Sequence, residues 1–286
     1  MNNNVSKVII KSIITNLFLV VIKILCGIFM YSNALIADGI HSLSDLVTDF
    51  VAIIGNHLSK KPADDKHPYG HGKIEYITSI IISVFIIIIG MSLIINAFTD
   101  KIIIPSMLVV VVSLITIIFK YILSCYLIKK GKNYNNNILI SSGYESRTDV
   151  ISSIIVLISV LIMQLYNINP IFGYADLIAT IVLGIFIIKV GYDILKENLS
   201  IIIGEQETNK EILDSLKSLI LSINGIIDIK ELILSKYGFY SRLSLILTMD
   251  KSISLEAAHN ITDEVEEKIK EKYENILYIN IHMEPD

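Results

Sequence analysis

The chain has 286 residues, of which 53% are hydrophobic and only 18% are charged, and its mean hydropathy is +0.64. This composition is too apolar for an ordinary soluble domain of that length, so a membrane protein is expected. The net charge of −4 is unevenly distributed, because Ile, Leu and Val runs fill the first part of the chain and much of the Lys, Glu and Asp follows it. This break predicts two domains, 1–203 and 204–286.

Six segments are long and apolar enough to be transmembrane helices, which need about 20 mostly apolar residues. They are 12–31, 34–57, 76–98, 103–128, 138–166 and 171–195. The second connector holds four lysines and the fourth holds three, whereas the other three connectors hold one between them. By the positive-inside rule, both termini and the 204–286 domain are expected on the cytoplasmic side of a bacterial-type inner membrane.

The last part of the chain has the pattern of a small α+β domain. Apolar residues recur with helical spacing in 209–222 and 255–273, whereas three segments read as strands, namely 226–234, 243–248 and 276–282. The order αββαβ predicts an open sheet with helices on one face. The predicted fold class is therefore an all-α membrane domain of six transmembrane helices, followed by a small cytoplasmic α+β domain.

Charged side chains within the membrane segments cost about 2.5–3.5 kcal/mol each on insertion scales, so each is a functional candidate. Acidic residues and a histidine share one face of the second segment, at Asp38, His41, Asp45 and Asp49. In the fifth segment, Glu145 and Asp149 are one helical turn apart. If His41 and Asp45 face this second pair, one imidazole and three carboxylates offer tetrahedral ligation to a borderline ion such as zinc.

Two simpler interpretations compete with a metal site. The acidic residues would pair with basic residues of the membrane segments, namely Lys23, Lys120, Lys189 and Arg147, or would line a proton path without metal. Arg147 lies two residues from both Glu145 and Asp149, so it points to another face of the helix and receives no ligand role. Asp176 begins the sixth segment and is expected at the outer interface, where water solvates a carboxylate.

Taken together, these motifs resemble the cation diffusion facilitator family of divalent metal cation/proton antiporters. The resemblance covers nearly the whole chain: six membrane segments, SNALIADGIHSLSD in the second, KKPADDKHPYGHGKIE after it, ESRTD in the fifth, and the αββαβ tail. It implies a homodimer in which each protomer has its own transport site between the second and fifth helices. The transport ligands that it implies are His41, Asp45, Glu145 and Asp149.

The resemblance also implies a peripheral metal site in the cytoplasmic loop, at Asp64, His67 and His71. Two imidazoles and a carboxylate so close in sequence can reach one ion. Without the resemblance, a loop of simply solvated side chains would be the preferred interpretation. With it, metal binding is favoured, in a regulatory role.

A third site is implied in the cytoplasmic domain, where His259, His282 and Glu284 fall at ligand positions of the family's binuclear zinc site. Two other positions that often hold His in such sites are occupied by Lys230 and Ile246. A complete two-metal site is therefore not expected. Either His259 and His282 form a single weak site or they are surface residues.

The function predicted is a secondary transporter that exports divalent transition-metal ions from the cytoplasm in exchange for protons. Zinc is favoured. Manganese, iron, cobalt or cadmium are alternatives, because this chain has Glu145 at a position where zinc transporters of the family commonly have His, and Glu is a harder oxygen ligand. The sequence has no GxxxxGK[ST] loop, HExxH motif or nucleophile elbow, so neither a primary pump nor an enzyme is expected, nor an organic cofactor or nucleic-acid partner. The alternative is a membrane-anchored metal sensor or scaffold, which would not need two ligand pairs at bilayer depth.

Overall fold

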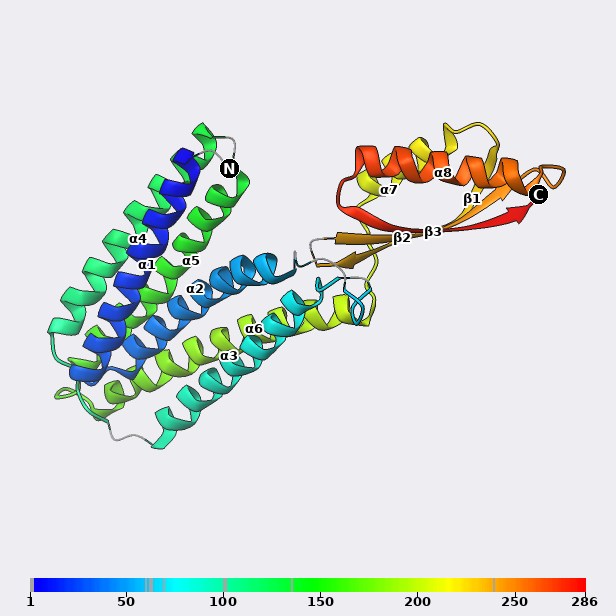
Figure 1. Cartoon of the computed structure of the whole chain (residues 1–286). Coiled ribbons are helices and arrows are strands. Elements are labelled where there is room, and N and C mark those ends of the chain that lie inside the picture. Colours follow the sequence, from blue (N-terminus) through cyan, green and yellow to red (C-terminus); the bar gives the residue numbers. More distant parts are fainter. Residues whose placement is uncertain are drawn as a thin grey trace. The chain divides into compact units, whose positions relative to one another are not determined.

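The computed structural model describes residues 3–59, 61, 64–68, 70–99, 102–134, 136–238 and 240–286, without the side chains of 3, 4, 6 and 48–59. Pro62, Ala63 and Tyr69 of the loop motif, and the side chain of Asp49, thus lie outside the described residues. The chain forms two compact units (Figure 1). One comprises Met1–Phe50 and Ile82–Asp193, and the other comprises Val51–Ile81 and Ile194–Asp286.

Long α-helices dominate the first two hundred residues. They are α1 (Asn3–Phe29), α2 (Asn33–Ser59), α3 (Ile74–Thr99), α4 (Leu108–Asn133), α5 (Asn137–Met163) and α6 (Ala175–Ile203), with the short 3-10 helix η1 (Pro170–Tyr174) before α6. Within the described residues, five helical segments are long and apolar enough to cross a membrane: Lys7–Phe29, Ile74–Thr99, Leu108–Asn133, Asn137–Met163 and Pro170–Ile203.

The helix α2 is not one of these five, although it has 27 residues. It carries three aspartates and His41 between residues 38 and 49, and these polar residues interrupt its apolar runs. The residues that suggested a metal site are thus the ones that make α2 less apolar than its neighbours. The sixth membrane span stays a prediction.

Large apolar side chains cover much of the outside of the helical unit. Phe18 is 64% exposed, and Phe29 and Phe98 are exposed to 75% and 68%. The interior instead contains small polar side chains that are almost fully buried, including Ser113, Thr116, Ser124, Ser152 and Ser153. An apolar exterior around an interior of small residues is typical of helices packed in lipid, where close backbone approach replaces the hydrophobic driving force.

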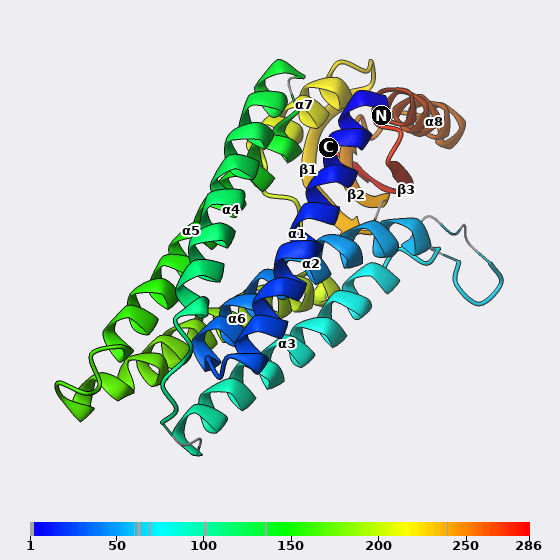
Figure 2. The same cartoon turned by 90° about the vertical axis from the view of Figure 1, so that its left-hand side faces the viewer.

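The helices α4 and α5 lie side by side along most of their length (Figure 2). Asn136 is the N-cap of α5, since its side chain accepts a hydrogen bond from the Leu139 amide at 3.0 Å. A Cβ atom at Gly143 would lie 2.5 Å from Ile128 Cγ1 and 3.0 Å from its backbone nitrogen. Glycine therefore permits the close contact that holds α5 against α4.

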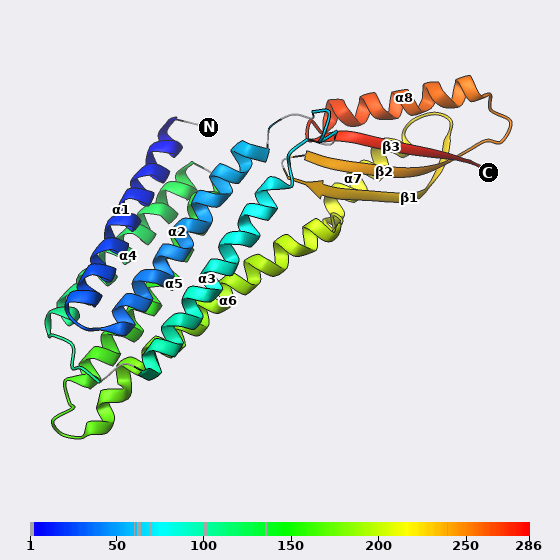
Figure 3. The ribbon, with the colours of Figure 1, turned by 60° about the horizontal axis from the view of Figure 1, so that its bottom comes forward.

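The C-terminal part confirms the predicted αββαβ order. It consists of α7 (Lys210–Leu221), β1 (Ile226–Tyr237), β2 (Tyr240–Met249), α8 (Leu255–Lys272) and β3 (Ile276–Pro285). The strand β2 lies between β1, to which it is antiparallel, and β3, to which it is parallel (Figure 3). Both helices cover the same face of the sheet (Figure 1).

The core of this domain follows from alternation along β2. Leu243, Leu245, Leu247 and Met249 are all buried, at every second position, so they point to one face. Leu216 of α7 and Val265 of α8 are fully buried in the same cluster. The helices begin at side-chain caps, where Asn209 accepts from the Glu211 amide and Ser254 from the Ala257 amide.

Candidate metal centres

His41 and Asp45 lie one turn apart on α2 and form a group with Asp149 of α5. Each residue offers one donor atom that lies within 4.8 Å of the donor atoms of the other two. His41 Nε2 is 4.0 Å from Asp149 Oδ1. His41 and Asp149 are buried and Asp45 is half-buried. We call these three residues the helical donor group; its one imidazole and two carboxylates suit a divalent transition metal.

One ring nitrogen of His41 has no hydrogen bond to the residues that the structure describes. Its Nδ1 atom is buried and has no partner among the described residues. A buried polar atom left unsatisfied costs roughly 1–3 kcal/mol. Coordination of a metal ion by Nδ1 itself, or a water bonded to Nδ1, would remove that cost.

Glu145, the fourth predicted ligand, is not brought into the helical donor group. It lies one turn before Asp149 on α5 and is exposed, although its charge acts on Asp45. A glutamate side chain is one bond longer than aspartate, and a rotation about its side-chain bonds changes where its carboxylate lies. The assignment of Glu145 as a ligand stays a prediction.

Two of the basic residues considered as ion-pair partners do pair with acidic residues. Lys120 of α4 pairs with Asp149, and Lys23 of α1 pairs with Asp38 at 2.7 Å. Asp38 also accepts hydrogen bonds from Ser152 Oγ at 2.6 Å and Ser153 Oγ at 2.8 Å. The carboxylate of Asp38 is thus held by an ion pair and two hydroxyl groups. The carboxylate of Asp149 takes part in an ion pair and also belongs to the helical donor group.

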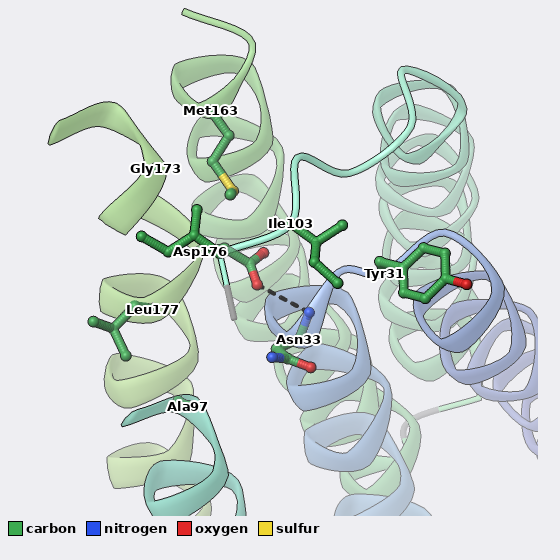
Figure 4. A pocket seen from close by; sticks show the side chains of 9 residues that line it. Tyr31, Asn33, Ala97, Ile103, Met163, Gly173, Asp176 and Leu177 are labelled. Atoms are coloured by element: carbon green, nitrogen blue, oxygen red, sulfur yellow. Dashed lines mark hydrogen bonds between the residues drawn. The ribbon is translucent and has the colours of Figure 1, made fainter. Parts of the chain in front are cut away.

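Asp176 is buried within the protein, contrary to the expectation of a solvent-exposed carboxylate. Its carboxylate accepts a hydrogen bond from the Asn33 amide at 2.9 Å (Figure 4). It accepts another from Ser32 Oγ at 3.0 Å. It thus caps the N-terminus of α2 from the neighbouring helix α6. Asp176 and Asn33 also line a cavity of about 370 Å³, together with mostly apolar side chains. A short polar connector before α2 gives no hint that its cap comes from 143 residues away.

The loop residues Asp64, His67 and His71 form a second group, which we call the loop donor group. Their donor atoms also lie within 4.8 Å of one another. Asp64 Oδ1 is 2.9 Å from His67 Nδ1, and Asp64 Oδ2 is 3.4 Å from His71 Nε2. His71 is buried, whereas Asp64 and His67 are exposed. The sequence thus predicted three residues that the fold does bring together.

Asp64 is already held by hydrogen bonds within this loop. Its Oδ1 atom accepts from the His67 amide at 2.7 Å and from the Lys66 amide at 3.1 Å. Partial desolvation raises the pKa of the Asp64 carboxyl, but these amide bonds and the His67 ring outweigh it and hold the pKa below its ordinary value. The carboxylate is therefore ionised and oriented before any ion arrives.

The residues predicted for the cytoplasmic domain do not form a three-residue donor group in the described part of the chain. His259 of α8 is 3.5 Å from Asp263, one turn later on the same helix. His282 and Glu284 are neighbours on β3, with 3.9 Å between Nε2 and Oε1. Lys230 of β1 also pairs with Glu284. A metal site in this domain stays a prediction.

Comparisons with known proteins agree with the division between helices and sheet. The model of the cation efflux transmembrane domain matches residues 9–203, and the model of the cation efflux protein cytoplasmic domain matches residues 208–286. The manganese efflux system protein MneP of Bacillus subtilis is 28% identical over 98% of this chain and 95% of its own length.

Two further relatives are of similar extent. An uncharacterized transporter of Methanocaldococcus jannaschii, MJ0449, is 30% identical over 98% of both chains. The cadmium, cobalt and zinc/H(+)-K(+) antiporter of Bacillus subtilis is 24% identical over 98% of this chain and 89% of its own length. The chain is therefore a membrane protein of the cation efflux family, a metal exporter and not an enzyme.

Proposed function

We propose that this protein exports divalent transition-metal ions from the cytoplasm in exchange for protons, and that His41, Asp45, Glu145 and Asp149 bind the ion in transit. The observation that carries the proposal is the helical donor group, a buried imidazole beside two carboxylates on two different helices. Burying ionisable side chains inside a membrane domain costs free energy unless they pair with one another or bind ions. Because they come from α2 and α5, a relative shift of these helices changes the site.

Manganese is the ion that we favour, ahead of the zinc favoured by the sequence motifs. The donor set is rich in oxygen, with one imidazole against two carboxylates and a third if Glu145 joins them. Carboxylate oxygens suit manganese, whereas zinc takes imidazole and thiolate more readily. A relative that aligns with nearly the whole chain is named for manganese efflux, while another is named for cadmium, cobalt and zinc.

Proton exchange follows from the chemistry of the ligands. A metal ion needs a neutral imidazole and ionised carboxylates, so binding a metal and binding protons exclude each other at the same atoms. Protons arriving from the outer side then release the ion, and their loss to the cytoplasm restores the site.

The remaining parts of the proposal concern the arrangement in the membrane. We propose six membrane spans including α2, cytoplasmic termini, a domain boundary near residue 204, and a homodimer. The positive-inside pattern supports the orientation. The family model that matches residues 208–286 is named ZT_dimer, and this name supports association between copies of the chain.

Metal flux into proteoliposomes tests this function. With the cytoplasmic face outward and the vesicle interior made acidic, Mn²⁺ should accumulate inside against its gradient while protons leave. An ionophore that collapses the proton gradient should stop the accumulation, and Asp45→Asn should show none. Metal binding without flux in any gradient would instead identify a membrane-anchored sensor or scaffold.

A further inference from the structure

Lys120 lies directly on the helical donor group. Its side chain is 2% exposed, and its ammonium nitrogen contacts Asp149 Oδ2. The other oxygen of the same carboxylate, Oδ1, faces His41 Nε2 at 4.0 Å. The positive charge of Lys120 also acts on His41 and on Asp45. One cation of the protein itself is therefore in contact with a ligand of the proposed site.

Lys23 forms a similar buried pair, but its aspartate partner is not part of the helical donor group. It is also fully buried and also paired with an aspartate, Asp38. Its ammonium group donates to Ser153 Oγ at 2.9 Å and to Ser42 Oγ at 3.3 Å, within a network of hydroxyl groups. Asp38, however, is not in the helical donor group. Among the described residues there are thus two buried lysine–aspartate pairs, of which one includes a residue of the helical donor group.

We propose that Lys120 is an intramolecular counter-cation that occupies Asp149 while the site is empty and that the metal ion must displace. This inference rests on the proposed function. A buried carboxylate without a partner is strongly unfavourable, so an empty site needs a positive charge at Asp149. The lysine ammonium is a compact charge on a flexible four-carbon chain, which can leave the carboxylate by bond rotation alone.

Two effects on transport follow from this arrangement. A divalent ion a few ångströms from an ammonium group is repelled by it, so Lys120 weakens metal binding. The same lysine re-forms its pair with Asp149 when the ion departs, which favours release. Lys120 thus keeps the affinity low enough for an ion to be unloaded, and it limits the time that Asp149 is uncompensated.

Metal affinity of lysine variants tests the proposal. Mn²⁺ binding would be measured by calorimetry on the detergent-solubilised full chain at fixed pH, in a His67→Ala, His71→Ala background that removes the loop donor group. Lys120→Met should bind Mn²⁺ about tenfold or more tightly, because the competing charge is gone. Lys120→Arg keeps the charge and should remain near the parent, and Lys23→Met should change affinity less than Lys120→Met does.

Lys120→Gln provides a second neutral variant if the methionine variant does not fold, since it keeps a hydrogen-bond donor for Asp149. Mn²⁺ affinity unchanged or weakened in a folded neutral variant would overturn the proposal and leave Lys120 with a purely structural role. Failure of the proposed function looks different: the parent itself would then bind no Mn²⁺ that depends on Asp45.

Discussion

The helical donor group and the loop donor group each have three possible metal-binding residues whose donor atoms lie within the same distance of one another, yet one group is largely buried and the other largely exposed. His41, Asp45 and Asp149 stand on long helices and are largely buried, whereas two of the three loop residues are exposed. In the loop, Asp64 is held by two backbone amides and by the His67 ring. In the helices, a nitrogen of His41 lacks a partner within the described part of the chain.

This difference indicates what each group can do. The loop residues satisfy one another without an ion, so binding a metal there replaces existing hydrogen bonds and gains little. The buried residues are shielded from solvent, so the charge of an ion acts on them more strongly than on the exposed loop residues, even though Lys120 already pairs with Asp149. A clustered set of donors is therefore weak evidence for function until its burial and its existing partners are known.

The largest expected effect is the loss of metal flux when a carboxylate of the helical donor group is removed. Asp45→Asn and Asp149→Asn should each lower Mn²⁺ flux in proteoliposomes by roughly 100-fold or more, since even groups that only support a ligand cost 10–100-fold. Asparagine keeps the volume of the side chain and isolates the loss of charge. Asp64→Asn is the matched control and should transport at a rate within a few-fold of the parent. Equal losses in all three variants would remove the distinction between the two groups.

A smaller effect is expected on selectivity. Glu145→His converts an oxygen donor into an imidazole, so the ratio of zinc to manganese flux should rise by about tenfold. Both ions should be measured under the same proton gradient, and Glu145→Gln serves as a control for loss of charge alone. A ratio that stays the same or falls in Glu145→His would withdraw Glu145 from the ligands, in line with its exposed position.

The loop donor group should modulate transport without being required for it. His71→Ala should shift the metal concentration at half-maximal flux by roughly fivefold, the equivalent of about one hydrogen bond, while maximal flux persists. The control is His259→Ala, which changes an exposed histidine outside the loop donor group. Complete loss of flux in a well-folded His71→Ala protein would show that the essential site has been misplaced.

The smallest effect concerns pH and stability in the loop. A carboxyl whose pKa is lowered by folding stabilises the protein above its unfolded pKa of about 3.9, and this contribution disappears as the pH falls through the folded value. The unfolding temperature of the parent should therefore exceed that of Asp64→Asn slightly at pH 5, and the difference should shrink as the pH falls below the unfolded pKa. Thermal unfolding in detergent measures both; a difference that widens toward low pH would contradict the lowered pKa of Asp64.

Periodicity and spacing predicted the elements and the grouping of the loop residues, because both depend on residues close together in the chain. That His41 and Asp45 meet Asp149 of another helix was implied by the family resemblance and not by spacing. The αββαβ order came from apolar alternation, and the loop donor group spans only eight residues, from Asp64 to His71. Pairing across the chain could not be read in the same way. A helical stripe shows which residues share a face, but not which face of another helix meets it, so the choice of Lys120 for Asp149 and Lys23 for Asp38 required the fold.

The capping of α2 by Asp176 has a mechanical consequence. The first turn of α2, the helix that carries His41 and Asp45, is bound to α6 through amides of Asn33 and Ala34. Breaking these bonds would leave a buried carboxylate and unpaired helix amides, so this end should stay attached during a transport cycle. When a helix is fixed at one end, a small tilt there becomes a larger displacement about two to three turns further on, where the proposed metal ligands lie. We expect movement of α2 to be greater at His41 and Asp45 than at the capped end.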